Sequence, residues 1–420
     1  MARVSRPERV LIAAAPAAIG PGWLLATRGP LLVVLVLGLV TSISLSQITL
    51  GVLTAWLFLA RRAGVVPRLR FPLAVPLALF AAWTVVAALG SAQPLDSLLS
   101  SKGLLNLAGL WIVASVLGDS LSARRFLTTL AVALGVVAAL SIVQVAACPP
   151  TPPAVSFDRG IRFFRNCQRA HGFFSIYMTL AGILSMVLIA TLPRLLRLES
   201  GARLVPVWLA SVVALALTYV RGAWVGLAAG AVVVLLTVRR RSVVAITLVV
   251  VVLAALAALP GVADRLRTIG TLRDDTTRDR LAMIKTGLSL TRAYPVTGIG
   301  PGQVKRVYPV AKGPEALRRS TSHLHNTPLQ IAVERGIPGL LAWIAIFAAF
   351  LVHTVRLVRR LPDGPERTLV IGVQAAIVSF LVAGLFEYNF GDTEVVLVAV
   401  ALMALPFVAE PATSTGAPEA

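Results

Sequence analysis

The chain has 420 residues, a length that corresponds to two or three domains in soluble proteins. Hydrophobic residues (AVILMFWYC) make up 57% and charged residues 14%, whereas soluble domains have about 45–50% apolar residues, glycine included, and about 25% charged residues. The mean hydropathy is +0.85 and the formal net charge is +21. The basic residues separate apolar stretches, which is typical of a membrane topology signal. Composition therefore excludes a soluble globular protein and a nucleic-acid-binding protein.

Apolar stretches long enough to cross a bilayer follow one another along the chain. A membrane helix needs about 20 mostly apolar residues, and this length predicts twelve spans, near 23–43, 45–61, 72–90, 103–118, 126–147, 172–192, 204–220, 222–238, 242–260, 337–355, 368–386 and 394–409. The predicted fold class is an all-α polytopic membrane protein. Pro16, Gly20 and Pro21 interrupt the first apolar run, so residues 9–26 form an interfacial helix, a re-entrant helix or a separate span. No A-x-A-like site follows a short apolar core, so we expect no cleavable signal peptide.

The distribution of lysine and arginine predicts the orientation of these spans. With the N-terminus in the cytoplasm, the short cytoplasmic segments hold 19 arginines and the short external segments hold six basic residues. The cytoplasmic set is Arg3, Arg6, Arg9, Arg61, Arg62, Arg68, Arg70, Arg124, Arg125, Arg194, Arg197, Arg203, Arg239, Arg240, Arg241, Arg356, Arg359, Arg360 and Arg367. The external set is Lys102, four arginines in 148–171 and Arg221. By the positive-inside rule, both chain ends are predicted to be cytoplasmic.

One external segment, 261–336, is itself rich in basic residues, with 13 of them. The predicted topology tolerates this charge because long loops are translocated largely regardless of their charge. Four parts are therefore predicted: 1–260 as a membrane domain with spans 1–9, 261–336 as a large external loop, 337–409 as a membrane domain with spans 10–12, and 410–420 as a disordered cytoplasmic tail.

Both cysteines of the chain, Cys148 and Cys167, fall in the external loop 148–171. Outside the cytoplasm such a pair can oxidise to a disulfide. Two unpaired thiols near the membrane surface are the alternative, and the sequence leaves both open.

The large external loop contains two predicted helices. The first begins near Thr276, with Asp279 three residues on as a weak capping box, and ends at Pro295. It carries an apolar face and basic residues, so we expect it to lie along the membrane surface. The apolar residues are Leu281, Ile284 and Leu288, and the basic ones are Arg278, Arg280 and Lys285. The glycines of the following segment, 297–302, are interpreted as turns, because no strand precedes them and a proline interrupts them.

The second predicted helix begins at an asparagine. Asn326 is a good N-cap, Pro328 is tolerated in the first turn, and Gly336 with Pro338 ends the helix before the next span. His325 then stands just before a helix N-terminus, where the macrodipole disfavours imidazolium and attracts anions. A neutral histidine beside an anion site suits a general base. A histidine that serves as a hydrogen-bonding cap is the alternative.

The pair His323 and His325 also raises the question of a metal site. Two histidines at i and i+2 do not share a helix face, and no cysteine or carboxylate cluster accompanies them. The other histidines, His171 and His353, fall on different loops or ends. We therefore predict no metal site.

Arg221 lies between two apolar runs. An arginine near membrane depth is usually functional, or else it snorkels to the interface. The predicted topology puts it on the external side, with the basic loop. Its planar guanidinium binds phosphate oxygens through two parallel hydrogen bonds, although arginine dominates the basic residues throughout this chain, with only four lysines.

Three segments together resemble the O-antigen ligase and Wzy-type polymerase superfamily of bacterial envelope glycosyltransferases. The first, RGAWVGL from Arg221, is similar to the family's "SRGAWLGL" stretch. The second, RLAMIK from Arg280 followed by YPVTGIGPG from Tyr294, resembles "R-L-x-x-W-K … P-L-x-G-x-G-x-G". The third, HNTPLQ from His325 with Glu334 and Gly336, resembles "H-N-x-x-L-Q-x-x-x-E-x-G".

Further features accompany these motifs. RAHGFF from Arg169 resembles an "R-A-x-G-x-F" opening of a middle span. The motifs cover roughly 165–345, and the span count extends the resemblance to the whole chain. Two departures are Ile284, where the family usually has tryptophan, and Pro328 within the helix start. Neither removes a titratable group, so they bear on substrate specificity.

The resemblance implies a GT-C-like, metal-independent glycosyltransferase without a cofactor, in the bacterial inner membrane with its active site facing the periplasm. Its donor would be an undecaprenyl-diphosphate-linked glycan, and its acceptor a lipid A–core or another glycan. Carried over, His325 would deprotonate the acceptor hydroxyl, while Arg221 and Arg280 would hold the diphosphate. His323 is the alternative base and Arg278 the alternative phosphate ligand, and Arg169, Asn326 and Gln330 are further candidates within the motifs.

Two alternatives remain open. The first is a Wzy-type polymerase of lipid-linked repeat units, because the residues do not distinguish the two acceptors. The second is a 12-span transporter or lipid flippase. It is less favoured because such proteins carry repeated halves and ionisable groups near the midplane. Here the charge gathers in one external loop.

Overall fold

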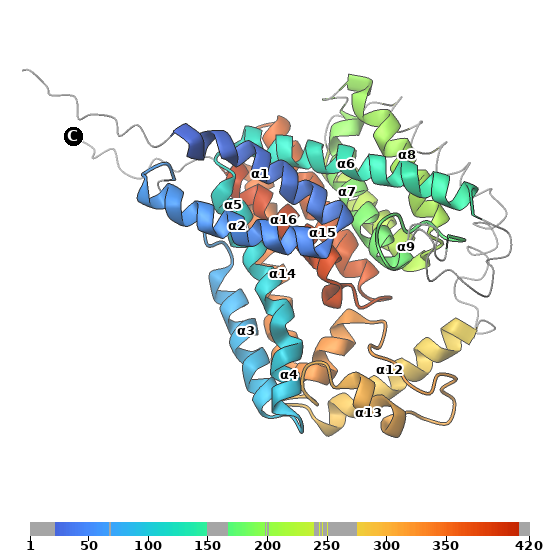
Figure 1. The fold of residues 1–420 in the computed structure, drawn as a ribbon. Coiled ribbons are helices and arrows are strands. Elements are labelled where there is room, and N and C mark those ends of the chain that lie inside the picture. Colours follow the sequence, from blue (N-terminus) through green and yellow to red (C-terminus); the bar gives the residue numbers. More distant parts are fainter. Residues whose placement is uncertain are drawn as a thin grey trace, which may run out of the picture.

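The computed structural model describes residues 22–66, 69–148, 167–197, 199, 201–238, 243, 246, 250 and 275–410. Within these ranges every regular element is a helix (Figure 1), so the predicted all-α class is confirmed. The predicted span 242–260 falls almost wholly outside the described residues. So do most of the segment 9–26, the start of the large loop and the tail beyond Glu410.

The helices are α1 (Gly22–Thr41), α2 (Ile43–Arg62), α3 (Ala74–Leu89), α4 (Pro94–Ser100), η1 (Ser101–Ala108), α5 (Gly109–Val116), α6 (Ser120–Ala146), α7 (Tyr177–Leu196), η4 (Gly201–Leu204), α8 (Val205–Leu217), α9 (Arg221–Thr237), α12 (Asp275–Ala293), α13 (Val304–Ala311), α14 (Thr327–Arg360), α15 (Pro365–Ala383), η5 (Asn389–Gly391) and α16 (Thr393–Ala409). Seven helical stretches among the described residues are long and apolar enough to cross a membrane: α1, α2, Pro94–Val116, α6, α7, α14 and α15. Four shorter apolar helices, α3, α8, α9 and α16, accompany them.

Eleven of the twelve predicted spans fall on these helices, but several boundaries were wrong. The helix predicted from 126 begins at Ser120, because Asp119 caps it and accepts a hydrogen bond from the Ser122 backbone N–H at 2.7 Å. The helix predicted at 172–192 is α7, and α14 runs past the predicted 355. Helices continue beyond their apolar segment because the hydrogen-bond ladder does not depend on hydropathy, and terminal arginines extend to the interface.

The centre of the bundle is formed by α7, α9 and α15, which pack on one another. Glycines make this close approach possible. A Cβ atom at Gly226 would stand 2.6 Å from the Ser379 carbonyl oxygen, and one at Gly372 would stand 2.1 Å from that of Ala190. Small residues at helix contacts are characteristic of membrane proteins. In lipid the hydrophobic effect does not drive apolar helices together, so their association depends on close van der Waals packing.

The segments predicted to be cytoplasmic meet at one end of this bundle. Arg124 lies 3.4 Å from Glu366, Arg197 lies 2.5 Å from Asp363, and the Thr368 hydroxyl donates to Glu199 at 2.7 Å. The starts of α6 and α15 and the end of α7 therefore share one side of the molecule.

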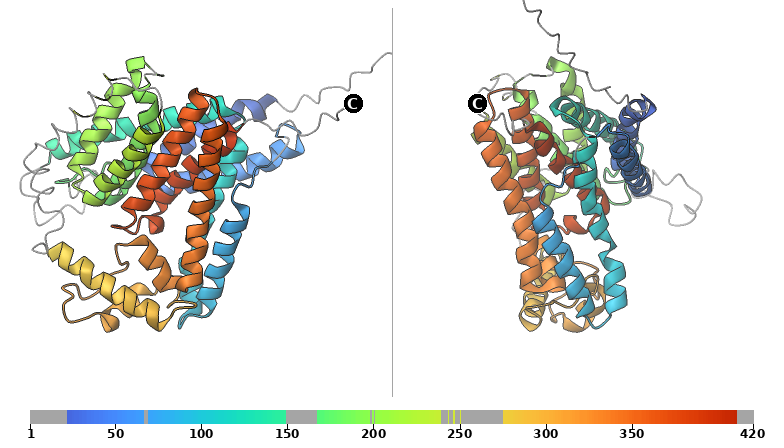
Figure 2. Two further views of the ribbon diagram at one scale, coloured as in Figure 1. Left: turned by 180° about the vertical axis from the view of Figure 1, so that it is seen from behind. Right: turned by 90° about the vertical axis from the view of Figure 1, so that its left-hand side faces the viewer.

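The segment predicted to form the large external loop has its own small apolar core. It consists of Met283, Leu290, Ile299, Val304, Tyr308, Leu324 and Val333. In Figure 1, α12 and α13 lie at the lower side of the view, away from α1, α2 and α6, and Figure 2 shows α14 and α3 side by side between the two regions. α13 was not predicted, because it is short and contains Pro309.

The predicted break between the two parts of α14 is present at Gly336. Its φ is 67° and its ψ is −176°, which is not helical. A Cβ atom there would lie 1.9 Å from the Val296 carbonyl oxygen, so the chain requires glycine at this point. The preceding turns form the helix predicted from Asn326, most of whose residues are buried, and the remainder coincides with the predicted span. The glycines of segment 297–302 form turns as predicted, since Gly298, Gly300 and Gly302 all have positive φ.

Candidate active site

A polar cavity of about 180 Å³ lies where several helix ends meet. It is lined by the start of α7, the junction of α8 and α9, one face of α12, and the segments around 318, 325 and 387. The lining residues are Arg169, Tyr177, Met178, Tyr219, Val220, Arg221, Gly222, Asp279, Arg280, Met283, Arg318, His325 and Glu387. Four of the predicted site residues, Arg169, Arg221, Arg280 and His325, are thus brought together from segments far apart in the sequence.

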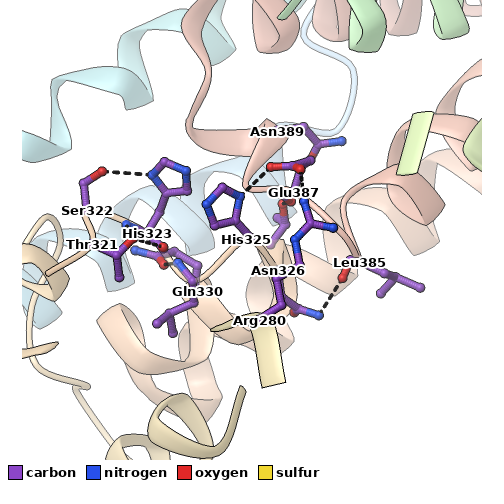
Figure 3. Close-up of polar contacts among 12 residues, drawn as sticks. Arg280, Thr321, Ser322, His323, His325, Asn326, Gln330, Leu385, Glu387 and Asn389 are labelled. Carbon is purple, nitrogen blue, oxygen red and sulfur yellow. Dashed lines mark hydrogen bonds and ion pairs between the residues drawn. The ribbon is translucent and has the colours of Figure 1, made fainter. Parts of the chain in front are cut away.

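His325 is held by a carboxylate. Its Nδ1 lies 2.7 Å from Oε2 of Glu387, and the two side chains are 11% and 14% exposed (Figure 3). In the neutral tautomer that suits this contact, Nδ1 carries the hydrogen and donates a hydrogen bond to the carboxylate. Nε2 then carries the free lone pair. The backbone of His325 has φ 48°, in the left-handed region. Such conformations cost free energy in residues other than glycine and persist where the surrounding structure imposes them, often at functional sites.

The same carboxylate binds an arginine. Oε1 of Glu387 accepts from Nη2 of Arg280, and both side chains are largely buried (Figure 3). Glu387 therefore links the arginine of α12 to the histidine before α14. It places the imidazole and the guanidinium on the two oxygens of one group.

Arg221 is the first residue of α9 and follows a tight reversal of the chain at Tyr219, whose φ is 55°. Gly222 allows this turn to approach the segment after α15, because a Cβ atom there would stand 2.7 Å from that of Phe386. Trp224 donates from Nε1 to the Leu215 carbonyl oxygen at 3.3 Å, which ties α9 back to α8. The RGAW sequence therefore sets Arg221 beside the segment that carries Glu387.

Arg318 and Asp279 form a second ion pair at the cavity, with Nε and Oδ2 3.0 Å apart. Asp279 is 5% exposed and also accepts from the backbone N–H groups of Leu317 and Arg318, at 3.0 Å each. The predicted capping-box role of Asp279 is thus replaced by a different one, because its carboxylate binds the loop at 317–318. Counting both pairs, the cavity lining holds four arginines and two carboxylates. It therefore carries an excess of positive charge.

Asn326 and Gln330 support the loop around His325. Asn326 is the N-cap of α14, as predicted: its Oδ1 accepts from the Leu329 N–H at 2.9 Å, and its Nδ2 donates to the Leu385 carbonyl oxygen at 2.9 Å. Gln330 is fully buried, and its Oε1 accepts from the Leu324 N–H at 2.9 Å. Neither residue lines the cavity. Both hold the chain on either side of His325.

His323 stands next to His325 but does not line the cavity. The sequence argument that residues two apart do not share a helix face does not apply, because this segment is not helical, and the two ring centroids are 4.5 Å apart. Ser322 Oγ lies 3.0 Å from Nδ1 of His323. Burial, and secondarily the neighbouring His325, lowers the pKa of His323 to about 4, so this imidazole is neutral at physiological pH.

The remaining candidates differ in position. Arg169 lies with its guanidinium carbon 4.5 Å from the centroid of the Tyr177 ring. It follows closely on Cys167, which forms a disulfide with Cys148. The disulfide, one of the two alternatives that the sequence left open, is therefore present, and it anchors the segment that carries Arg169. Arg278 is exposed and does not line the cavity.

Sequence reasoning missed Glu387, Arg318 and Tyr219. Glu387 follows directly on the predicted span 368–386, and a carboxylate beside an apolar span is a signal that it has a partner. Arg318 carried no such signal, because it is one of 13 basic residues in the segment 261–336. The left-handed backbone of Tyr219 belongs to a turn that the apolar pattern does not reveal.

Residues 206–344 match a protein-family model described as O-antigen ligase. The matched region includes Arg221, Arg280, Arg318 and His325 and ends before Glu387. No curated protein matches the chain. The family match confirms the resemblance that the three motifs indicate.

Proposed function

Because residues 206–344 match a family model described as O-antigen ligase, we propose that this membrane protein is a ligase-type glycosyltransferase. It moves a glycan from undecaprenyl diphosphate to a hydroxyl of a lipid A–core acceptor at the periplasmic face of the inner membrane. The observation that carries the proposal is the gathering of Arg169, Arg221, Arg280 and the His325–Glu387 pair around one cavity.

His325 acts as the general base. The hydrogen bond from Nδ1 to Glu387 leaves Nε2 as the proton acceptor and stabilises the imidazolium that forms when the acceptor hydroxyl is deprotonated. As the new bond forms between the acceptor oxygen and the anomeric carbon, the bond from that carbon to the phosphate oxygen breaks. The electron pair leaves with undecaprenyl diphosphate.

Arg221 and Arg280 bind the diphosphate. The negative charge that develops on the leaving phosphate needs positive charge placed beforehand, and guanidinium groups bind two phosphate oxygens at once. Arg169 and Arg318 line the same cavity and add to its positive potential. Glu387 offsets part of this charge while it orients Arg280.

The test is transfer in vitro, with a lipid-diphosphate glycan as donor and donor binding measured separately. His325→Ala is expected to lower the transfer rate by about 10²–10⁴-fold while the donor still binds. Arg221→Lys and Arg280→Lys are expected to weaken both binding and rate, because a point charge does not replace the planar guanidinium. The matched controls are His353→Ala and Arg292→Lys, which lie outside the cavity lining.

Three results would contradict this assignment. Near-normal turnover by His325→Ala would move the base to His323. Normal donor binding by both arginine variants would remove them from the diphosphate site. Loss of activity in EDTA that a divalent ion restores would overturn the metal-free mechanism, which predicts full activity in EDTA.

A Wzy-type polymerase shares this chemistry and differs in its acceptor. The same assay separates the two, because a ligase elongates added lipid A–core and a polymerase lengthens the lipid-linked repeat unit when that acceptor is absent.

A further inference from the structure

A second cavity, of about 440 Å³, lies between α1 and α6. Its lining residues are Leu25, Arg28, Gly29, Leu32, Val33, Val36, Asp119, Leu121, Ser122, Arg125, Phe126 and Thr129. It shares no residue with the candidate active site. It opens near the start of α6, at the end of the bundle where Arg124 pairs with Glu366, and this is the side predicted to be cytoplasmic.

Two arginines, Arg28 and Arg125, line this cavity. The Nη2 atom of Arg28 is buried, and no hydrogen-bond partner for it exists among the residues that the structure describes. Close contact with the chain at Gly118 restricts this group, since a Cβ atom there would lie 2.8 Å from the Arg28 Nη2. A buried donor without an acceptor costs free energy, and an arginine cannot relieve that cost by losing its proton.

The one carboxylate among the lining residues, Asp119, interacts electrostatically with Arg28 and Arg125 and also caps a helix. Its Oδ1 accepts from the Ser122 N–H at 2.7 Å as the N-cap of α6. The lining therefore carries two cations against one carboxylate, which leaves an excess of one positive charge. Its polar end is complementary to an anion with several acceptor oxygens.

The rest of the cavity is apolar and continuous with the outer surface of the helices. Val36 and Phe126 are buried, with 1% and 4% of their surface exposed, whereas Leu25 and Val33 are 57% and 46% exposed. In a membrane protein, exposed leucine and valine on a spanning helix contact lipid. A ligand here would have its charged group at the arginines and a hydrocarbon chain along α1 and α6.

We propose that this cavity binds one anionic glycerophospholipid, with its phosphate between Arg28 and Arg125 and one acyl chain against Leu25, Leu32 and Val33. Two other ligands fit the cavity less well. Free phosphate would not contact its apolar walls, and the headgroup of a zwitterionic lipid would place a cation beside the two arginines. Basic pockets between membrane helices on the cytoplasmic side are a known setting for anionic headgroups. The proposal is independent of the chemistry assigned to the external cavity.

The experiment uses the full chain in detergent, titrated with phosphatidylglycerol and followed by native mass spectrometry. One tightly held lipid is expected. Arg28→Gln and Arg125→Gln are each expected to weaken its binding about fivefold, because each basic side chain contributes about 1 kcal/mol to an anionic headgroup. Arg62→Gln is the control, since Arg62 stacks on Phe58 at 4.3 Å outside the cavity.

Two further measurements identify the class of ligand and test the site without removing an arginine. Neither inorganic phosphate nor phosphatidylcholine should displace the bound lipid. Val33→Trp, which fills the apolar part and leaves both arginines in place, should also weaken binding. Equal binding by wild type, Arg28→Gln and Arg125→Gln would overturn the proposal, and so would displacement by phosphate alone or an unchanged affinity in Val33→Trp.

Discussion

Glu387 is the residue on which the geometry of the candidate active-site cavity depends most. One of its oxygens binds His325 and the other binds Arg280, so a single carboxylate orients two groups from segments far apart in the sequence. Partners of this kind fix the tautomer and direction of a histidine without contacting the substrate. In the proposed mechanism, Glu387 is therefore a positioning residue.

Replacing Glu387 with Gln tests this role. The amide oxygen still accepts one hydrogen bond, but the negative charge that stabilises imidazolium is lost. We expect kcat to fall about 10–100-fold, with a smaller change in KM for the donor and an altered pH profile of kcat. Steady-state kinetics across a pH series would measure this. Glu315→Gln, in the exposed pair with Lys285, serves as the control. A Glu387→Gln enzyme with unchanged kcat and pH profile would contradict the role.

The lowered pKa of His323 predicts how the stability of the folded protein depends on pH. Burial lowers its pKa to about 4 from 6.5, so the unfolded chain binds the proton more readily than the folded protein. The stability linked to His323 is then fully present above pH 6.5 and is lost as the pH falls toward 4. His323→Asn should flatten this decline in thermal midpoint, measured at several pH values. Parallel curves for wild type and variant would show that His323 does not contribute to it.

At the scale of elements, the site is built almost entirely at helix junctions. Arg221 begins α9, His325 precedes α14, and Glu387 follows α15. Two of these junctions contain residues with a left-handed backbone, Tyr219 and His325. Helix ends leave unpaired backbone groups and change the chain direction, so they can bring charged side chains from several helices to one point.

The disulfide between Cys148 and Cys167 joins the end of α6 to the segment that carries Arg169. Closing a loop of this size contributes about 3 kcal/mol in the chain-entropy model. Cys148→Ser with Cys167→Ser should lower the thermal midpoint and weaken donor binding, because Arg169 loses its anchor. Donor affinity and melting of the double variant, with reduced wild type for comparison, would measure both effects. Unchanged melting would show that the bond adds no stability.

At the scale of the molecule, the charged groups separate into two sets. Arg124, Arg197, Asp363 and Glu366 gather at one end of the bundle, and the arginines of the external cavity come from segments predicted to lie on the opposite side. Segments assigned to the same side by counting arginines therefore meet in space. This agreement supports the proposed periplasmic position of the cavity.

Thiol labelling tests the orientation directly. The two natural cysteines are paired, so a new cysteine at an exposed proline is the sole reactive thiol expected. In spheroplasts, Pro314→Cys should react with an impermeant reagent, and Pro362→Cys should react only after lysis. Both prolines are exposed, so accessibility to solvent is matched. The reverse pattern would place the external cavity in the cytoplasm.

The sequence by itself determined the helical membrane class, most of the spans, the N-cap at Asn326, the break at Gly336, and three of the charged residues that meet in the cavity. These depend on hydropathy, capping chemistry and backbone sterics, which act over a few neighbouring residues. The tertiary structure decided the rest. It paired His325 and Arg280 through Glu387, set Asp279 against Arg318, and left Nη2 of Arg28 without a partner among the described residues, beside an apolar cavity. The ion pairs join residues that are far apart in the chain. These pairs, and the burial of the Arg28 nitrogen, arise from the packing of distant segments, which no local sequence pattern encodes.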